Sequence, residues 1–226
     1  MIDKICNYLT NRIRKEMPEM DDERAEIINY GLQNIIGEIP KLFLTIFLAV
    51  ILNILELTLI AFISVLAYRA FSGGFHAKTH LACIIFTNLF YIGNAYISQL
   101  FILEPYFVKY IVIAILWVFS MAMIKLYAPA DTENVPILRK KDRRNKQILS
   151  YVTMTITLLV AVFISIPVVA NIIIIGVFLQ TLSITRLVYK LTNNQYVHEL
   201  YEKQNVVINQ VEYKVFAGKI LVLYIL

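Results

Sequence analysis

Three residues of types that can carry out chemistry fall into one short stretch of the chain. His76, His80 and Cys83 lie within eight residues, and they include two of the three histidines and one of the two cysteines. A cysteine thiolate can attack a carbonyl carbon while a neighbouring imidazole accepts the thiol proton and later protonates the leaving amine. The stretch therefore predicts a nucleophilic site with Cys83 as the nucleophile.

The path of the backbone decides which histidine can serve as the base. In one continuous helix, His76 and Cys83 would lie about 10 Å apart along the axis, whereas His80 would be a neighbour of Cys83 on the helix surface. His76 can reach the thiol only if the chain turns before Thr79, and the Gly73-Gly74 pair together with a helix cap at Thr79 favours that turn. The cap would place Cys83 about one turn inside a helix. Backbone amides there, or those of the glycine pair, could stabilise an oxyanion.

Two other interpretations of the same residues stay open at this level. The spacing of His76, His80 and Cys83 also permits three zinc ligands on one face. Against zinc, Ala77 stands where a helical zinc protease motif would carry its glutamate base. In the second interpretation, Cys83 is a small buried residue and the histidines lie at the membrane interface. We expect no metal and no other cofactor.

The composition indicates what kind of scaffold must position these residues. Of the 226 residues, 59% are hydrophobic and 16% are charged, whereas soluble domains average roughly 45–50% apolar and about 25% charged residues. This excludes a disordered chain and an ordinary soluble enzyme, and it favours a polytopic membrane protein. We expect a lipid bilayer around the chain and no nucleic acid partner. Two cysteines do not suggest a disulfide scaffold.

Apolar stretches of about 20 residues predict the membrane-spanning helices. Residues 81–103 and 148–185 carry no charge, and the second of these stretches must fold back, with residues 167–171 as the turn. Residues 106–127 are a third clear stretch, with Lys125 near one end and Lys109 near the other, where it can extend toward the headgroups. Residues 39–55 and 57–72 are shorter, and they form either two more spans or a re-entrant pair. The predicted fold is an all-α polytopic membrane protein with six transmembrane helices, or with four and a re-entrant pair.

The distribution of lysine and arginine predicts the orientation. With six spans, every basic connection falls on one side, which the positive-inside rule identifies as the cytoplasm, and both termini lie there. No signal peptide is evident, and residues 1–37 contain a predicted amphipathic helix at the membrane surface, ended by Pro18, and a second helix capped by Asp21 or Asp22. We predict a membrane-embedded domain over residues 1–191. Residues 192–226 form a tail of unassigned role in which His198 is expected at the surface.

Two motifs resemble the AgrB family, the integral-membrane cysteine endopeptidases of accessory-gene-regulator quorum sensing. Residues 69–77, followed by Cys83, are similar to the family signature, in which Gly-Gly precedes His-Ala and a cysteine stands seven residues after the histidine. Residues 127–137 resemble the family loop after the fourth span. The resemblance covers roughly residues 1–192 and implies a multi-pass protein of a bacterial cell membrane.

The resemblance also implies a reaction and its residues. Cys83 corresponds to the catalytic cysteine and His76 to the catalytic histidine, while Arg69 and Gly74 correspond to positions needed for activity. Such a thiol protease removes the C-terminal part of an AgrD-like precursor peptide. The acyl-enzyme thioester then closes to a cyclic thiolactone or lactone. A homodimer is implied as well.

Other residues are candidates for supporting roles, and a different function remains possible. Gly73 and His80 could support the site, and Gln33 could orient His76. A basic cluster could attract the acidic part of the precursor: Arg139, Lys140, Lys141, Arg143 and Arg144. The alternative function is a non-enzymatic transporter or exporter of a peptide or small molecule. Against it, the polar residues of the spans (Asn88, Asn94, Gln99, Asn171 and Gln180) are scattered, and no acidic residue lies at a midplane.

Overall fold

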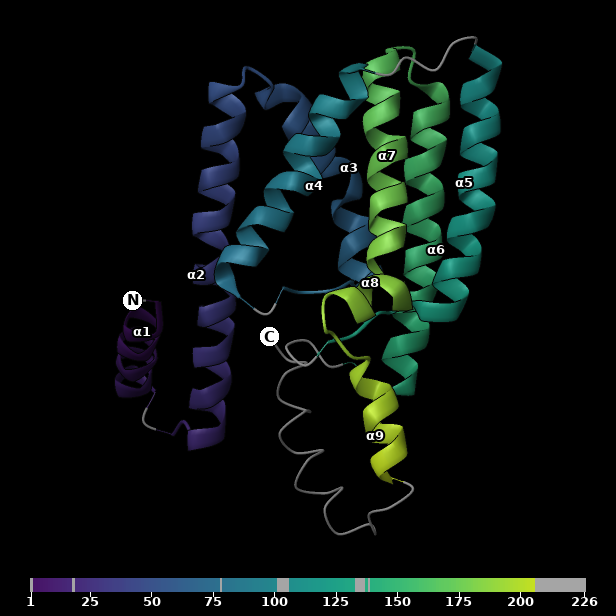
Figure 1. The fold of residues 1–226 in the computed structure, drawn as a ribbon. Helices are drawn as coiled ribbons and strands as arrows, with labels where there is room; N and C mark the ends of the chain where they lie inside the picture. The colour runs from purple at the N-terminus through teal and green to yellow at the C-terminus, as the bar shows by residue number, and fades with distance from the viewer. Residues whose placement is uncertain are drawn as a thin grey trace. The chain divides into compact units, whose positions relative to one another are not determined.

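The computed structural model describes residues 2–17, 19–77, 79–100, 106–132, 137 and 139–205. In this part of the chain every regular element is a helix (Figure 1). The helices are α1 (Ile2–Glu16), α2 (Asp22–Ile51), α3 (Leu55–Ser72), α4 (His80–Leu100), α5 (Tyr106–Tyr127), α6 (Lys140–Phe163), α7 (Pro167–Ser183), α8 (Arg186–Leu191) and α9 (Val197–Asn205). The predicted all-α class is confirmed.

The chain divides into two units, of which the first contains α1 and α2 up to Leu44. The Asp21 carboxylate accepts a hydrogen bond from the Arg24 N–H at 2.8 Å, so the predicted cap of the second helix is confirmed. The two helices are joined by the Asn29 amide, which donates to Asn7 Oδ1 at 2.7 Å. Cys6 is fully buried. That α1 lies on a membrane surface stays a prediction.

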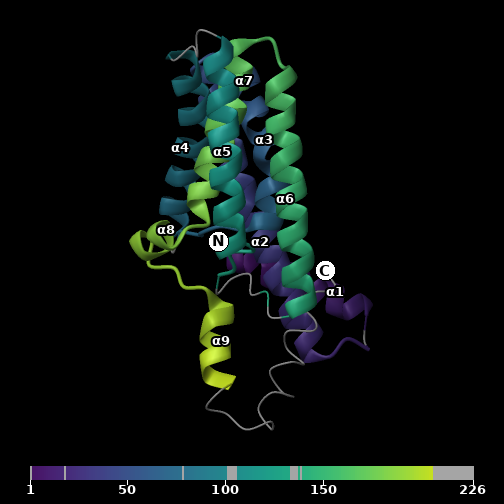
Figure 2. The same cartoon turned by 90° about the vertical axis from the view of Figure 1, so that its right-hand side faces the viewer.

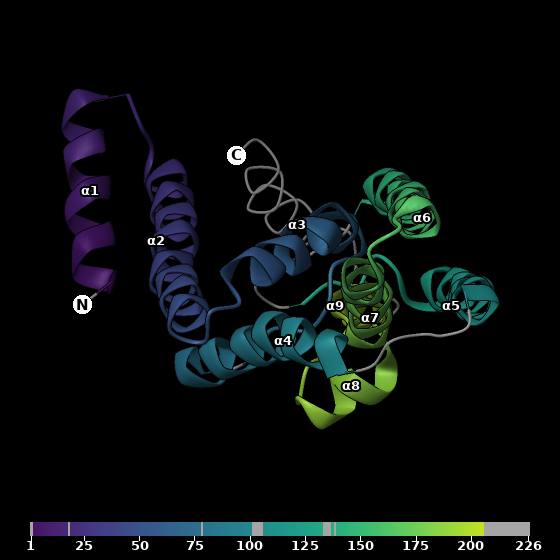
Figure 3. The same cartoon turned by 90° about the horizontal axis from the view of Figure 1, so that it is seen from above.

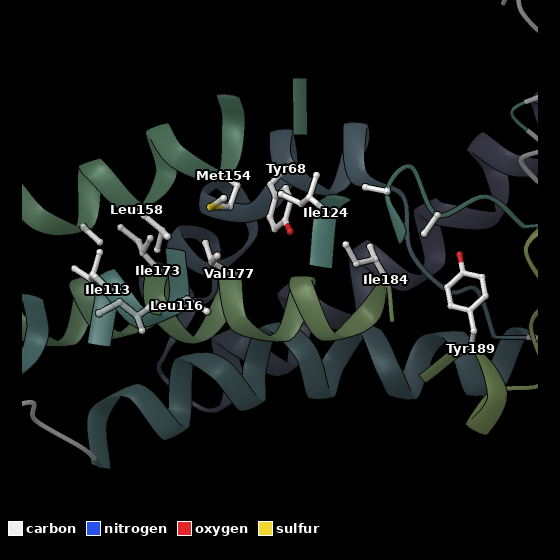
Figure 4. Packing of buried hydrophobic residues seen from close by; sticks show 14 of the residues in the cluster. Tyr68, Ile113, Leu116, Ile124, Met154, Leu158, Ile173, Val177, Ile184 and Tyr189 are labelled. Atoms are coloured by element: carbon white, nitrogen blue, oxygen red, sulfur yellow. The ribbon is translucent and has the colours of Figure 1, made fainter. Parts of the chain in front are cut away.

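The second unit, Thr45–Lys203, is a helical bundle built around α7. Helices α3, α4, α5 and α6 all pack against α7, which lies between them when the bundle is seen from above and from the side (Figures 2 and 3). The core is formed by apolar side chains from several of these helices, including Tyr68, Ile113, Leu116, Ile124, Met154, Leu158, Ile173 and Val177 (Figure 4). The bundle thus buries the central helix on most of its sides.

The outside of the bundle carries many exposed apolar side chains. On α5, Ile113 and Leu116 face the core, whereas Phe107, Ile111 and Ile115 are exposed at helical spacing. A helix that is apolar on all sides suits a hydrocarbon surrounding. Helices α3, α4, α5 and α6 are long and apolar enough to cross a membrane, while α7 is apolar but has only 17 residues. The chain is therefore a multi-pass membrane protein, and the count of six spans stays a prediction.

The basic connections of the bundle gather at one end. The Gly74 N–H donates to Ala130 O at 3.1 Å and the Phe75 N–H donates to Ser183 O at 3.3 Å, so three connections meet there. The short connection between α6 and α7 lies at the opposite end (Figure 1). This arrangement agrees with the predicted separation of basic and uncharged loops. Which end faces the cytoplasm stays a prediction.

Two local predictions need correction. The turn expected at residues 167–171 lies at residues 164–166 instead, because Pro167 occupies the first turn of α7, where its fixed φ and missing N–H are tolerated. Lys109, expected to extend toward the headgroups, is buried and donates to Val162 O at 3.2 Å and to Ile164 O at 3.1 Å. The ammonium group thereby satisfies carbonyls at the C-terminal end of α6.

Close packing between α3 and α7 depends on Gly176, and this can be tested. A Cβ atom at Gly176 would lie 2.8 Å from Val65 Cγ1 and 3.2 Å from Asn94 Nδ2. We expect Gly176→Ala to cost about 1–3 kcal/mol of stability, because overpacking forces neighbouring side chains to shift. The measurement is the thermal unfolding midpoint of the detergent-solubilised protein. Gly93→Ala is the control, since its Cβ would meet nothing closer than Leu89 Cδ2 at 4.0 Å. Equal midpoints for both variants would contradict this interpretation.

Candidate functional site

Cys83 lies at the start of a helix, as the sequence predicted. Helix α4 begins at His80, and Thr79 caps it: the Ala82 N–H donates to Thr79 Oγ1 at 3.2 Å. The Cys83 N–H donates to Thr79 O at 3.0 Å, so Cys83 is one turn inside the helix. Its side chain is partly exposed. A partly accessible thiol near the positive end of a helix is in a favourable position for a nucleophile.

His76 lies outside both neighbouring helices. Helix α3 ends at Ser72 and α4 begins at His80, so the axial separation expected of one continuous helix does not apply. The His76 carbonyl accepts a hydrogen bond from Asn194 Nδ2 at 2.8 Å, and its side chain is partly exposed. The turn that the sequence required before Thr79 is therefore present. The side chain of His80 lies outside the described residues. The zinc interpretation depends on that side chain and stays a hypothesis.

The two glycines allow the loop before His76 to touch another connection. Gly73 and Gly74 have positive φ angles of 71° and 142°, which side-chain-bearing residues rarely adopt. The Ala130 N–H donates to Ser72 O at 2.8 Å and Gly74 donates back to Ala130 O, which forms a short parallel bridge. A Cβ atom at Gly73 would lie 2.3 Å from Ala130 O. Glycine is thus required for the close approach.

The amides of this loop are already used. Gly73 donates to Arg69 O at 3.0 Å, Gly74 donates to Ala130 O and Phe75 donates to Ser183 O. The expectation that the glycine amides could stabilise an oxyanion is therefore wrong in this conformation. Helical geometry leaves the first amides of a helix without intrahelical acceptors. In α4 the Ala82 and Cys83 N–H groups already donate to Thr79, so the candidate donors are the N–H groups of His80 and Leu81.

Arg69 and Gln180 hold the same loop from the side of the bundle. Arg69 Nη1 donates to Gln180 Oε1 at 3.0 Å and Nη2 donates to Phe75 O at 3.4 Å. Gln180, on α7, is fully buried and its amide donates to Ser72 Oγ at 2.9 Å and to Gly73 O at 2.8 Å. Sequence reasoning treated Gln180 as a scattered polar residue. Its position near the end of the uncharged stretch 148–185 was the one feature of the sequence that set it apart.

A buried carboxylate that sequence reasoning did not single out lies next to the parallel bridge. The Asp131 side chain is fully buried and accepts hydrogen bonds from the N–H and Nδ1 of His198, at 3.0 and 2.6 Å. Arg143 lies 3.7 Å from the same carboxylate and donates to His198 Nε2 at 3.1 Å. The prediction that His198 is a surface residue is wrong. Its partner Asp131 is 67 positions away in the sequence, which no local pattern reveals.

Two tyrosines complete the surroundings of this carboxylate. The rings of Tyr189 and Tyr196 are stacked with their centroids 4.2 Å apart. Burial raises the pKa of both phenols above the usual value, so both stay protonated. Tyr189 donates to Asp131 O at 3.2 Å and Tyr196 donates to Ile184 O at 2.6 Å. The segment after α7 is thereby fixed to the loop that contains Asp131.

The remaining predicted site residues are Gln33 and the basic cluster, of which, in the described part of the chain, Arg143 alone is shown in contact with Asp131 and His198. Gln33 is on α2, but its side chain is outside the described residues. The basic cluster occupies the start of α6, where four of its members are exposed: Arg139, Lys140, Lys141 and Arg144. Arg143 differs, because its guanidinium group is partly buried against Asp131 and His198.

Comparisons with known proteins agree with this architecture. Residues 4–184 match the family AgrB, Accessory gene regulator B. An AgrB-like protein of Listeria monocytogenes serotype 4a (strain HCC23) is 26% identical over 84% of this chain and 90% of its own length. AgrB-like protein 2 of Clostridium perfringens (strain 13 / Type A) is 27% identical over 72% of this chain and 76% of its own length. No solved structure matches. The chain therefore belongs to the accessory gene regulator B family of membrane proteins, which acts in quorum sensing.

Proposed function

We propose that this chain is a membrane cysteine endopeptidase that cleaves an AgrD-like precursor peptide. The observation that carries the proposal is the position of Cys83, with a partly exposed thiol one turn inside α4. His76 lies on the loop that precedes α4, and that loop is held by hydrogen bonds from three other segments. Such a loop can keep an imidazole in position for proton transfer.

The first half of the proposed reaction produces an acyl-enzyme. The Cys83 thiol transfers its proton to His76, and the sulfur attacks the scissile carbonyl carbon. When the C–N bond breaks, His76 returns the proton to the leaving amine. The C-terminal part of the precursor departs, and the N-terminal part remains on Cys83 as a thioester.

The second half releases the signal. A cysteine thiol or serine hydroxyl within the bound peptide attacks the thioester carbonyl, and Cys83 leaves as the ring closes. Exchange of one thioester for another is nearly balanced in free energy, whereas hydrolysis would discard the activated bond. A site at the membrane boundary can limit the access of water. The exposed basic residues at the start of α6 are suited to attract an acidic precursor segment.

Trapping of the acyl-enzyme tests the proposal. The full chain in lipid vesicles is mixed with an AgrD-like precursor peptide and quenched in acid, and the protein is analysed by mass spectrometry. We expect an adduct with the mass of the N-terminal fragment on the peptide that contains Cys83, and its release by neutral hydroxylamine. Cleavage without an adduct on Cys83 would contradict the thioester mechanism. Passage of intact precursor across the vesicle would instead support the transporter alternative.

A further inference from the structure

The segment after α8 lies outside the family match, which ends at residue 184, yet it contacts the loop of His76. Asn194 Nδ2 donates to the His76 carbonyl at 2.8 Å, the shortest of the three hydrogen bonds that this amide donates; the other two go to Thr192 Oγ1 at 2.9 Å and Thr192 O at 3.3 Å. The Asn194 N–H donates to Tyr189 O at 2.8 Å. Both the amide group and the backbone of Asn194 are thus fixed.

A second connection joins the same segment to the glycine pair. His198 donates through its N–H and its Nδ1 to the buried Asp131 carboxylate. Because Nδ1 donates to Asp131, Nε2 of a neutral ring accepts the hydrogen bond from Arg143. The residue before Asp131 is Ala130, which pairs with Ser72 and Gly74. Hydrogen bonds therefore connect His198 on α9, through Asp131 and its neighbour Ala130, to the Gly73-Gly74 turn.

These two connections meet on either side of His76. One fixes the carbonyl of His76 itself, and the other supports the turn two residues before it. A buried carboxylate left without its donors is costly, so the second connection is strongly maintained. We propose that Asn194 and His198 are positioning residues of the peptidase site, which hold the His76 loop against the start of α4. This inference rests on the proposed function of Cys83 and His76.

Alkylation of Cys83 by iodoacetamide tests the inference without the precursor peptide. In this reaction the sulfur–carbon bond forms as iodide leaves, and the thiol proton passes to a base. We expect Asn194→Ala in the full chain to slow modification of Cys83 at neutral pH by about tenfold or more, because misplacing a catalytic group by about 1 Å can cost up to about 10²-fold. The rate is measured by mass spectrometry, and buried Cys6 is followed in the same samples.

The controls separate positioning from folding. Asn193→Gly changes the neighbouring asparagine, which is exposed and has a positive φ of 54°, so glycine fits there and the rate should equal that of wild type. His198→Ala should slow alkylation, while His198→Asn should restore much of the rate, since its amide can donate near the position of Nδ1. With the precursor, Asn194→Ala should lower kcat and leave KM unchanged. For each variant, we expect a thermal unfolding midpoint close to that of wild type, which shows that the slower reaction does not come from unfolding.

The outcomes are distinguishable. If His76→Ala and wild type are alkylated at the same rate, the proposed function fails and this inference fails with it. If His76→Ala is slow but Asn194→Ala matches wild type, this inference alone is overturned. If Asn194→Ala does not fold, the pair His198→Ala and His198→Asn decides: a difference between them supports the inference, and equal rates overturn it.

Discussion

Cys83→Ala is expected to abolish cleavage of the precursor, with a loss of at least about 10³-fold in rate. Alanine removes the only atom that can form the acyl-enzyme in the proposed mechanism, and no thioester can then be passed to a ring-closing nucleophile. The measurement is the amount of cleaved and cyclised peptide formed in vesicles that contain equal amounts of folded wild-type and variant protein.

The second cysteine provides a matched control. Cys6 is fully buried and belongs to the first unit, and its replacement by alanine removes a thiol in the same way as Cys83→Ala does. Cys6→Ala should cleave like wild type. Cleavage that survives Cys83→Ala would exclude the cysteine mechanism. Cleavage lost equally in both variants would point to general damage from loss of a thiol.

His76→Ala is expected to lower the cleavage rate by about 10²–10⁴-fold, the usual contribution of a general acid–base group. His76 lies on a loop that α7, Arg69 and Asn194 hold in place. His80 instead begins α4, and its replacement should only weaken cleavage. The measurement is the single-turnover rate of precursor cleavage for both variants, compared with wild type at equal protein concentration.

The comparison of the two histidines decides the identity of the base. If His80→Ala proves inactive and His76→Ala retains activity, the roles of the two residues must be exchanged. In that case the base would be the neighbour of Cys83 on the helix surface. A loss in both variants, with thermal midpoints unchanged, would assign a part in catalysis to each.

Much of the scaffold could be predicted because membrane helices are recognisable from uninterrupted apolar segments. Residues 106–127 were predicted as a span and form α5 with the same bounds. The prediction for α6 began at residue 148, whereas the helix begins at Lys140. Hydropathy predicts which residues lie in the hydrocarbon of the membrane. The helix itself can extend beyond the hydrocarbon, because its backbone hydrogen bonds also form in water. Pro167 was expected in a turn because proline breaks helices, yet it fits the first turn of one.

The candidate site could be predicted only where its residues are close in sequence. Thr79 and Cys83 belong to one local pattern, so the cap and the position of the thiol followed from it. Gln180 and Asn194 reach the His76 loop from more than 100 positions away. Single polar residues of this kind look alike in a sequence whether they bind lipid, water or a distant carbonyl. Their roles depend on the packing of α7 and of the segment after it.

The short central helix has a consequence for the loops at its two ends. The 17 residues of α7 reach about 26 Å at 1.5 Å per residue, less than the roughly 30 Å of a typical hydrocarbon core. Because α3, α4, α5 and α6 pack around α7, protein rather than lipid covers this shorter helix. Irregular backbone at membrane depth is tolerated where it is buried in protein, so the bundle can hold the loops at the ends of α7 below the headgroups.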